Sequence, residues 1–332
     1  MRKINGVPVE AHTDLSNLTG GEVLKWDSTN TLMAWEDQDS TGYVPWVFQG
    51  DTYGFHAGNT ASDVINRFAF ASNTTATDWG NLTSTRYLLA GCSSSTDGFT
   101  AGGGPTTNII DKFSFTSSSG ASDHGDLNNN TRGPAGSSST TQGFASGGEA
   151  SANVIDKFDF SSNTTATDHG DLSMSHGYNS AGITSTDNGF VAGGQPPGTV
   201  TNSISKFSFS SNVTATDHGD ILVARGRAPG VSSSTYGYVC GGGNNDGSRS
   251  NTIDKFAFAS NTTATDHGDL SRNVDGKSGQ SGVDYGFTSG GETYAEESTN
   301  VIDRFAFSSN TTATDWGDLA EAGKKGAGGM QV

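Results

Sequence analysis

The most chemically suggestive phrase in the sequence is Asp-His-Gly-Asp, which occurs four times. Its copies begin at Asp123, Asp168, Asp217 and Asp266. Two carboxylates three residues apart could hold a calcium ion, and the histidine could add a ligand for a transition metal. A calcium site needs about six or more oxygen ligands, however, and each copy supplies only two carboxylate side chains. We therefore interpret the aspartates as turn caps and the histidines as packing residues, and we expect no metal and no cofactor.

The sequence lacks the usual spacing signatures of an enzyme. The sequence shows no nucleophile elbow, no pair of histidines at helical spacing and no carboxylate pair that departs from the repeat. We therefore expect that the protein is not an enzyme. Carboxylates that converge only in space leave no spacing signal, so a carbohydrate-active enzyme stays open as an alternative.

Composition and charge exclude several classes of protein. The chain has 332 residues, a formal net charge of -17 and 18 Lys and Arg residues that form no basic run, so we expect no nucleic-acid partner. No stretch approaches the length of a membrane span, and the N-terminus lacks the apolar core of a signal peptide, so we expect a soluble protein without a membrane partner. Cys92 and Cys240 make no CxxC pattern, and we expect two buried free thiols.

A long internal repeat underlies the recurring phrases. The phenylalanine of a Lys-Phe or Arg-Phe pair recurs at spacings of 45, 45, 49, 49 and 49 residues. These phenylalanines are Phe68, Phe113, Phe158, Phe207, Phe256 and Phe305. In residues 109–115 apolar side chains alternate onto both sides of the strand, as in a sheet packed between two neighbours. Units of this length are typical of four-stranded propeller blades, so the sequence predicts an all-β, six-bladed β-propeller.

The order of residues within the units resembles the kelch motif. One unit reads Trp79, Leu82, Arg86, Ala90-Gly91, Gly98-Phe99, Gly102-Gly103 and Phe113. Arg132 and Arg225 are assigned to the basic position in other units, and His176 in the fourth. The tryptophan recurs only as Trp316, and the units between carry His124, His169, His218 and His267. The resemblance implies a kelch-like propeller over residues 41–332 and no particular function.

The end of the chain imitates the start of an inner strand. Residues 324–332 (KKGAGGMQV) resemble residues 132–139 (RGPAGSSS), yet no complete unit follows them. We therefore predict that residues 324–332 supply a strand to blade one. Such closure removes exposed sheet edges, which matters for a chain whose similar strands could pair wrongly.

Residues 1–40 lie outside the repeat and resemble a different family. Their Asp-Leu-Ser-Asn-Leu turn, Gly-Glu-Val-Leu-Lys-Trp strand and later tryptophan are similar to a short module of tail-fibre and other virion proteins of tailed bacteriophages. The repeat phrases also resemble structural proteins from phages of marine cyanobacteria. The resemblance implies a β-hairpin or extended segment for virion attachment or oligomerisation. Its attachment residues would be Leu15, Leu18, Val23, Leu24, Trp26 and Trp35. Alternatively, the segment caps the ring, with its tryptophans as packing residues.

Loop lengths distinguish one half of the ring from the other. The connection between the double glycine and the following strand has six residues in the first three units, nine in the fourth (195–203) and ten in the last two (243–252 and 292–301). Loops on a rigid scaffold often carry recognition, although neutral drift also lengthens them. We take these residues as candidate binding residues: Gln195, Asn244, Asn245, Arg249, Tyr294 and Glu296.

Together these features predict a phage virion structural protein that is assembled in the host cytoplasm. It would be a tail fibre, a vertex fibre or an adhesin attached to the capsid or tail. Its N-terminal segment would bind other virion proteins and could form a homotrimer, and its long loops would bind a host-surface glycan or protein. The alternatives are a decoration protein without a receptor and the carbohydrate-active enzyme.

Overall fold

The computed structural model describes residues 48–332 except 296 and 324–325, and in the N-terminal segment the backbone of four short strands. Contacts divide the chain into two units, Met1–Trp46 and Val47–Val332. The expected boundary at residue 40 lies outside the described residues. Each unit is treated by itself below.

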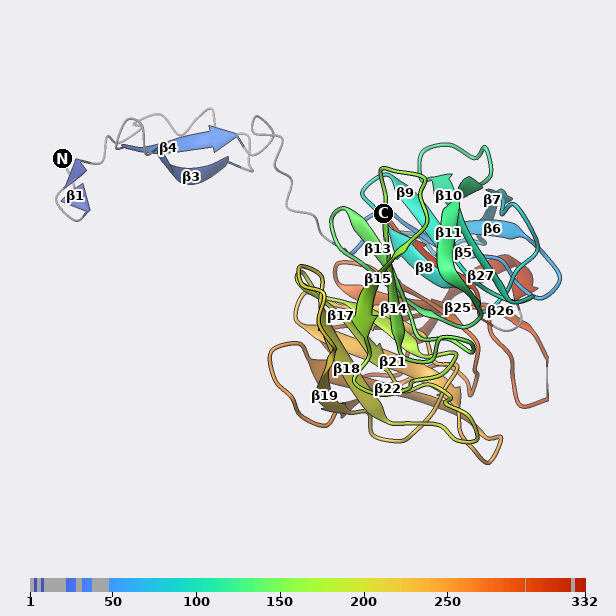
Figure 1. The fold of residues 1–332 in the computed structure, drawn as a ribbon. Helices are drawn as coiled ribbons and strands as arrows, with labels where there is room; N and C mark the ends of the chain where they lie inside the picture. Colours follow the sequence, from blue (N-terminus) through green and yellow to red (C-terminus); the bar gives the residue numbers. More distant parts are fainter. Residues whose placement is uncertain are drawn as a thin grey trace. The chain divides into compact units, whose positions relative to one another are not determined.

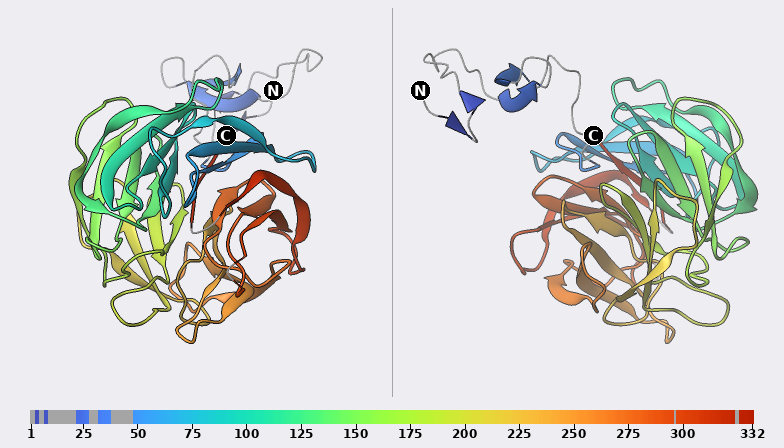
Figure 2. Two further views of the ribbon diagram at one scale, coloured as in Figure 1. Left: turned by 90° about the vertical axis from the view of Figure 1, so that its right-hand side faces the viewer. Right: turned by 60° about the vertical axis from the view of Figure 1, so that its left-hand side comes forward.

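The second unit is a six-bladed β-propeller, which confirms the predicted fold class (Figures 1 and 2). Each blade is a four-stranded antiparallel sheet. Blade two contains β8 (Ala90–Ser93), β9 (Asp97–Ala101), β10 (Thr107–Ser114) and β11 (Ser122–Thr131). Blade three contains β12 (Ala135–Ser138), β13 (Gln142–Ser146), β14 (Val154–Asp159) and β15 (Thr167–Asp171). The part of the chain that the structure describes contains no helix that could cross a membrane.

The remaining complete blades repeat this order from the axis outward. Blade four contains β16 (Ala181–Thr184), β17 (Asn188–Ala192), β18 (Ser203–Ser208) and β19 (Thr216–Asp220). Blade five contains β20 (Gly230–Ser232), β21 (Tyr236–Gly243), β22 (Arg249–Ala257) and β23 (Thr265–Asp269). Blade six contains β24 (Ser278–Ser281), β25 (Tyr285–Ser289), β26 (Thr299–Ala306) and β27 (Thr314–Gly323).

Blade one is built from both ends of the propeller. Its outer strands are β5 (Tyr53–Ala57), β6 (Val64–Ala69) and β7 (Thr77–Asn81), and its innermost strand is β28 (Gly328–Gln331). Met330 pairs in register with Phe55 and is fully buried. Figure 2 shows the C-terminus beside the blue strands of blade one.

Glycines let the six inner strands approach one another around the axis. One glycine in each inner strand faces the equivalent glycine of the preceding blade. They are Gly91, Gly136, Gly182, Gly230, Gly279 and Gly329. A Cβ atom on any of them would overlap the carbonyl oxygen of its neighbour. A glycine is therefore required at this level of every blade, because the ring cannot close around a larger residue.

A closed ring of side-chain hydrogen bonds lies next to the glycines. In each inner strand a backbone N–H donates to a hydroxyl or amide oxygen of the adjacent blade, at 2.9 to 3.3 Å. The acceptors belong to Ser93, Ser138, Thr184, Ser232, Ser281 and Gln331. Gln331, from the C-terminal strand, completes this ring and donates through Nε2 to the carbonyl of Phe48.

The Asp-His-Gly-Asp phrase joins each blade to the next. Asp123 accepts a hydrogen bond from the N–H of Gly125, and the ring nitrogen Nε2 of His124 lies 2.9 Å from the carbonyl oxygen of Asp159 in blade three. The same ring contact recurs around the propeller. Its ring residues are Trp79, His124, His169, His218, His267 and Trp316, each bound to the third strand of the following blade.

The Asn-Thr-Thr-Ala phrase supplies further contacts between blades. The side chain of Asn163 donates to the carbonyl of Asp123, and the N–H of Ala166 donates to the carbonyl of Asp126. These near-verbatim phrases thus form the blade-to-blade junction, which explains why they recur. Their repetition has a structural cause.

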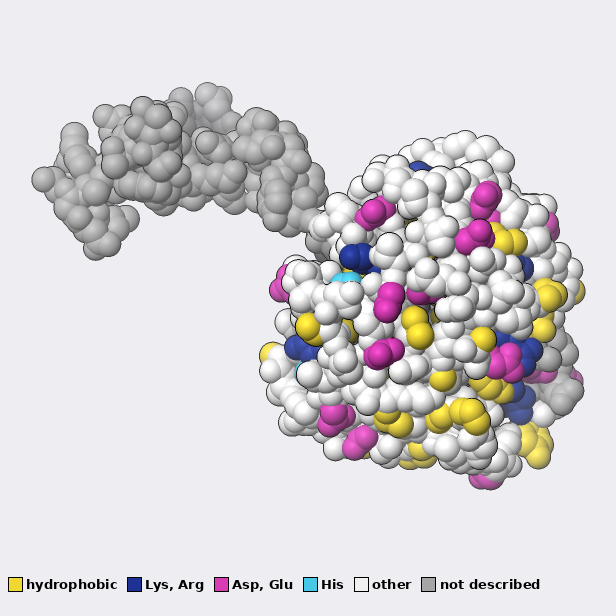
Figure 3. Space-filling model, in the orientation of Figure 1, with side chains coloured by type: hydrophobic (Ala, Val, Ile, Leu, Met, Phe, Trp, Pro, Cys, Tyr) yellow, Lys and Arg dark blue, Asp and Glu magenta, His cyan; other side chains and the backbone are white. Residues whose placement is uncertain are grey.

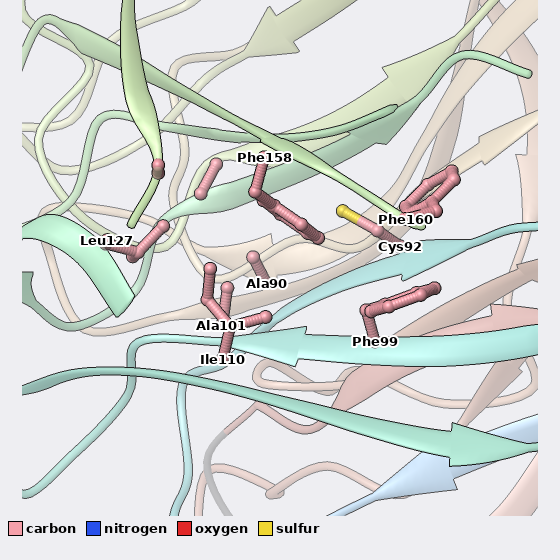
Figure 4. Packing of buried hydrophobic residues seen from close by; sticks show 10 residues of the cluster. Ala90, Cys92, Phe99, Ala101, Ile110, Leu127, Phe158 and Phe160 are labelled. Atoms are coloured by element: carbon pink, nitrogen blue, oxygen red, sulfur yellow. The ribbon is translucent and has the colours of Figure 1, made fainter. Parts of the chain in front are cut away.

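The hydrophobic core lies between adjacent blades. In one cluster Phe99 of blade two stacks on Phe160 of blade three at a centroid separation of 4.6 Å. Figure 4 shows Cys92 beside Phe158 and Phe160 in this cluster. Cys92 and Cys240 are both buried and free, and burial raises the pKa of the Cys92 thiol to about 12. A thiol of this kind acts as a small apolar residue.

The first unit contains two short two-stranded sheets. One pairs β1 (Lys3–Ile4) with β2 (Val7–Pro8), and the other pairs β3 (Glu22–Asp27) with β4 (Leu32–Asp37). Leu24 pairs in register with Trp35, and Val23 and Trp26 lie in β3. Leu15 and Leu18 lie outside the described residues.

Candidate binding site on the loop face

The two ends of the propeller are formed by different connections. The connections between the second and third strands of the blades lie at one end, which we call the loop face. Gln195, the first residue of such a connection, bridges to Tyr178, which precedes an inner strand. Gly50 bridges instead to Gly282, which follows an inner strand. Phe48–Gly50 therefore lie at the opposite end of the propeller, which we call the N-terminal face.

A closed ring of backbone hydrogen bonds surrounds the axis at the loop face. In each blade one N–H donates to the carbonyl of the equivalent residue in the preceding blade, at 2.5 to 2.8 Å. The six residues are Leu88, Gly133, Asn179, Arg227, Gly276 and Gly326, and all have positive φ between 55° and 70°. Glycine adopts this conformation without cost. Leu88, Asn179 and Arg227 adopt it despite their side chains, and such strain is concentrated at functional sites.

A pocket of about 160 Å³ lies at the axis on this face, and we call it the axial pocket. It is lined by Tyr87, Leu88, Arg132, Tyr178, Asn179, Arg227, Asp275, Gly276 and Glu292. Asn179 is only 8% exposed, and its Nδ2 donor has no hydrogen-bond partner in the structure. The pocket thus combines aromatic rings, charged groups and an unpaired buried donor.

Ion pairs fix the charged groups at the rim. The guanidinium of Arg132 is bound to Glu149 at 2.5 Å, and this partner raises the pKa of Arg132. Asp275, whose side chain is 5% exposed, is bound by Arg227 at 3.4 Å and by Arg249 at 3.2 Å. Each arginine at the site therefore has an acidic partner.

Four of the candidate binding residues meet in a second pocket of about 270 Å³, which we call the loop pocket. Gln195, Asn244, Asn245 and Arg249 all line it, between the long loops of blades four and five. Asn245 donates to the hydroxyl of Thr199 at 3.0 Å and so connects the two loops. The loop lengths alone therefore led to residues that the fold brings together in one pocket.

The other two candidate binding residues are Tyr294, which is not among the residues that line the loop pocket, and Glu296. Tyr294 is 73% exposed, and its ring centroid lies 5.9 Å from the guanidinium carbon of Arg249, at the edge of the same region. Glu296 lies outside the described residues.

Sequence reasoning missed the axial residues Tyr87, Tyr178, Asn179 and Arg227. A signal for two of them was present in the sequence. Equivalent positions in other blades hold glycine, at Gly133, Gly276 and Gly326. A bulky residue where half of the repeats use glycine indicates a position under a special requirement.

The assignment of Arg132 to the basic position of the repeat was wrong. Arg86 is buried and forms a 2.6 Å ion pair with Asp111, and Arg225 is likewise paired with Asp254 at 2.9 Å. The position equivalent to Arg86 ahead of the inner strand of blade three is held by the buried Thr131, 45 residues on and the last residue of β11. Arg132 is the next residue along the chain, just beyond the end of β11, and it lines the axial pocket instead.

Among the described residues, no group of three or more His, Cys, Asp and Glu side chains is placed to hold a metal ion. The histidines of the Asp-His-Gly-Asp phrases contact backbone carbonyls at the blade junctions instead. His124, for example, contacts the carbonyl oxygen of Asp159.

Comparison with known proteins shows the fold alone. No family model and no curated protein matches this chain. Solved structures do match, and one of them is YjhT, with a TM-score of 0.66 and 13% sequence identity. The match covers 82% of this chain and 99% of YjhT. It supports the six-bladed propeller, and since propellers host many activities, it does not define what the site does.

Proposed function

We propose that this chain is a virion structural protein of a tailed bacteriophage, a fibre or an adhesin attached to the capsid or tail. In this proposal the N-terminal unit binds other virion proteins and assembles as a trimer, and the loop face contacts the host surface. We further assign the repeats to a kelch-like type. The double glycines support this assignment, and so do Trp79 and Trp316, whose indole N–H groups donate to the next blade.

One observation carries the proposal. The propeller begins at Phe48–Gly50 on its N-terminal face, whereas the axial and loop pockets lie on the opposite face. A protein held through its N-terminal unit can therefore leave the pockets accessible. Many copies on one particle would strengthen individually weak contacts.

The surface is consistent with a particle-borne role rather than nucleic-acid binding. On the side drawn in Figure 3, acidic side chains are scattered among uncharged groups, with few Lys or Arg residues. The formal net charge of -17 opposes association with nucleic acid.

The test is a cryo-EM map of intact particles together with mass spectrometry of their proteins. The proposal expects density for the propeller with its N-terminal face toward the particle, and expects purified full-length chain to compete with phage adsorption. Incorporation without competition would favour a decoration protein. Absence from the particle, with degradation of host polysaccharide by the purified chain, would favour the enzyme.

A further inference from the structure

We infer that the loop face binds a neutral oligosaccharide that spans the axial pocket and the loop pocket, with Arg227 contacting it between the two. This inference deepens the proposed host-surface function by naming the class of ligand. The binding site itself can be tested without a phage.

The two pockets adjoin one another. Arg227 and Asp275 line both of them, so this ion pair forms their common wall. Their volumes of about 160 and 270 Å³ together fall in the range of about 300–1,000 Å³ that is typical of small-molecule sites. A ligand longer than one sugar unit can therefore occupy both.

The backbone at Arg227 favours a role for its side chain. Arg227 has a φ of 58° at a ring position where three other blades use glycine. A residue with a Cβ in this conformation costs roughly 1–2 kcal/mol relative to an unstrained one. Its side chain is 38% exposed and stands at the wall between the pockets. Removing the side chain should relieve the strain, and Asp275 would keep Arg249 as its partner, so the strained arginine indicates a use beyond folding.

Unpaired polar atoms are present in both pockets. Nδ2 of the buried Asn179 is a donor without a partner in the axial pocket, and Oδ1 of Asn244 is an acceptor without a partner in the loop pocket. Buried polar groups normally have partners, which a ligand or water can supply. Both atoms are enclosed in the unbound structure, so a small rotation of each amide on binding would bring it to a sugar hydroxyl, which both donates and accepts.

The charges at the site favour a neutral sugar over an acidic one. Arg132 is paired with Glu149, Arg227 and Arg249 share Asp275, and Glu292 also lines the axial pocket, so the three arginines are matched by three nearby carboxylates and the site has no excess of positive charge for an anionic ligand. The chain as a whole repels polyanions. The rings of Tyr87 and Tyr178 supply apolar faces on which the C–H faces of a sugar can pack.

The experiment measures binding of the full-length chain to neutral hexose and N-acetylhexosamine oligosaccharides of increasing length, from monosaccharides upward. Oligosaccharides of the same lengths that contain uronic acids serve for comparison. We expect affinity to rise by roughly tenfold or more once the ligand is long enough to reach both pockets. Affinities are then remeasured by titration calorimetry for the variants.

The principal variant is Arg227→Gly. It should lower the affinity for the long ligand by roughly tenfold or more while leaving the melting temperature unchanged or higher, because glycine already occupies this ring position in three blades. Arg272→Gly is the matched control. Arg272 is exposed, lies in the connection that leads to blade six and lines neither pocket, so this variant should bind as the unaltered chain does.

Four results would overturn the inference: no saccharide binding, binding of uronic-acid ligands only, equal affinity for monosaccharide and long ligand, or full affinity in Arg227→Gly. A chain found in virions that binds no saccharide would refute this inference and leave the proposed function standing. A chain that binds the neutral ligand yet is absent from virions would do the reverse.

Discussion

The indole Nε1 of Trp316 donates a 3.2 Å hydrogen bond to the carbonyl of Ala69, across 247 residues of sequence. This bond joins blade six to blade one and so closes the ring. Arg304 lies 3.5 Å from the centroid of the same indole, and Arg67 lies 3.7 Å from that of Trp79. Where the chain has histidine in place of tryptophan, it has lysine in place of arginine, at Lys112, Lys157, Lys206 and Lys255. The two positions therefore change together, and tryptophan with arginine occurs at the junctions that blade one makes on both sides.

Removing the ring from the closing junction should destabilise the propeller. We expect Trp316→Ala to lower the free energy of unfolding by about 2–3 kcal/mol, through lost packing and the lost hydrogen bond. The measurement is urea denaturation of the full chain. The control is Trp316→His with Arg304→Lys, which copies the other junctions and should stay within about 1 kcal/mol of the unaltered protein. Equal urea midpoints for Trp316→Ala and the unaltered chain would contradict the role of this contact.

Acid should weaken the fold through its histidines. Burial lowers the pKa of His176, His218 and His267, and it lowers the pKa of His56 to about 3. Below about pH 6.5 these histidines bind protons in the unfolded chain but stay neutral in the folded chain. Their full contribution to the free energy of unfolding is therefore present above that pH and decreases as the pH falls. Urea midpoints at about pH 7.5 and about pH 5.5 measure the loss.

The histidine contribution can be separated from that of other groups. Burial also raises the pKa of Asp156 and Asp254, which acts in the opposite direction at low pH. His218→Gln keeps a donor for the carbonyl of Ala257 but cannot take up a proton. Its urea midpoint should therefore depend less on pH. An unchanged pH dependence in this variant would show that His218 does not contribute.

Enlarging an axial glycine should strain the ring. A Cβ at Gly329 would overlap the carbonyl of Gly279, so Gly329→Ala should cost at least about 1–3 kcal/mol, as overpacking does elsewhere. Gly198→Ala is the comparison, because no atom lies within 4 Å of a Cβ there and only its φ of 86° opposes the change, at about 1 kcal/mol. Thermal denaturation distinguishes the two. If both variants melted alike, the close approach at the axis would be refuted.

The chain itself offers a replacement for the buried ion pair of Arg225 and Asp254. Arg225 and Asp254 are both fully enclosed, so Arg225→Met alone should cost about 3–5 kcal/mol by leaving a buried carboxylate without its cation. Blade four fills the equivalent positions with His176 and Ser205, joined by a 2.7 Å hydrogen bond. The double variant Arg225→His with Asp254→Ser should therefore recover most of the loss. A double variant no more stable than Arg225→Met would show that the two positions are not interchangeable between blades.

The fold was predictable from the sequence because each blade repeats the same contacts. Phe113, Phe158 and their equivalents recur in phase since every blade packs on a neighbour in the same way. Recurrence also predicted a structural role for the Asp-His-Gly-Asp phrase, in which the histidines contact the next blade. It could not distinguish Arg132 from Thr131, because residue type alone does not reveal which of two adjacent residues is buried.

The candidate site was predictable only in part. Unequal loop lengths led to Gln195 and Asn244, which share a pocket, because insertions mark where blades differ. The axial pocket depends instead on differences within equal lengths. Arg227 replaces a glycine without altering any spacing, so only knowledge of its left-handed backbone gives the substitution its meaning.

The place of β28 in blade one governs when this protein can finish folding during its synthesis. Tyr53–Ala57 leaves the ribosome early, but its partner Gly328–Gln331 follows only after the other five blades have been made. The growing chain must therefore hold an incomplete ring with an unpaired strand edge, which is the condition that favours aggregation and misassembly. Crowded translation of many copies exposes that edge to identical strands on neighbouring chains. Pairing of β28 with β5 is thus the step that ends this exposure, because β5 then has no free edge left for a neighbouring chain.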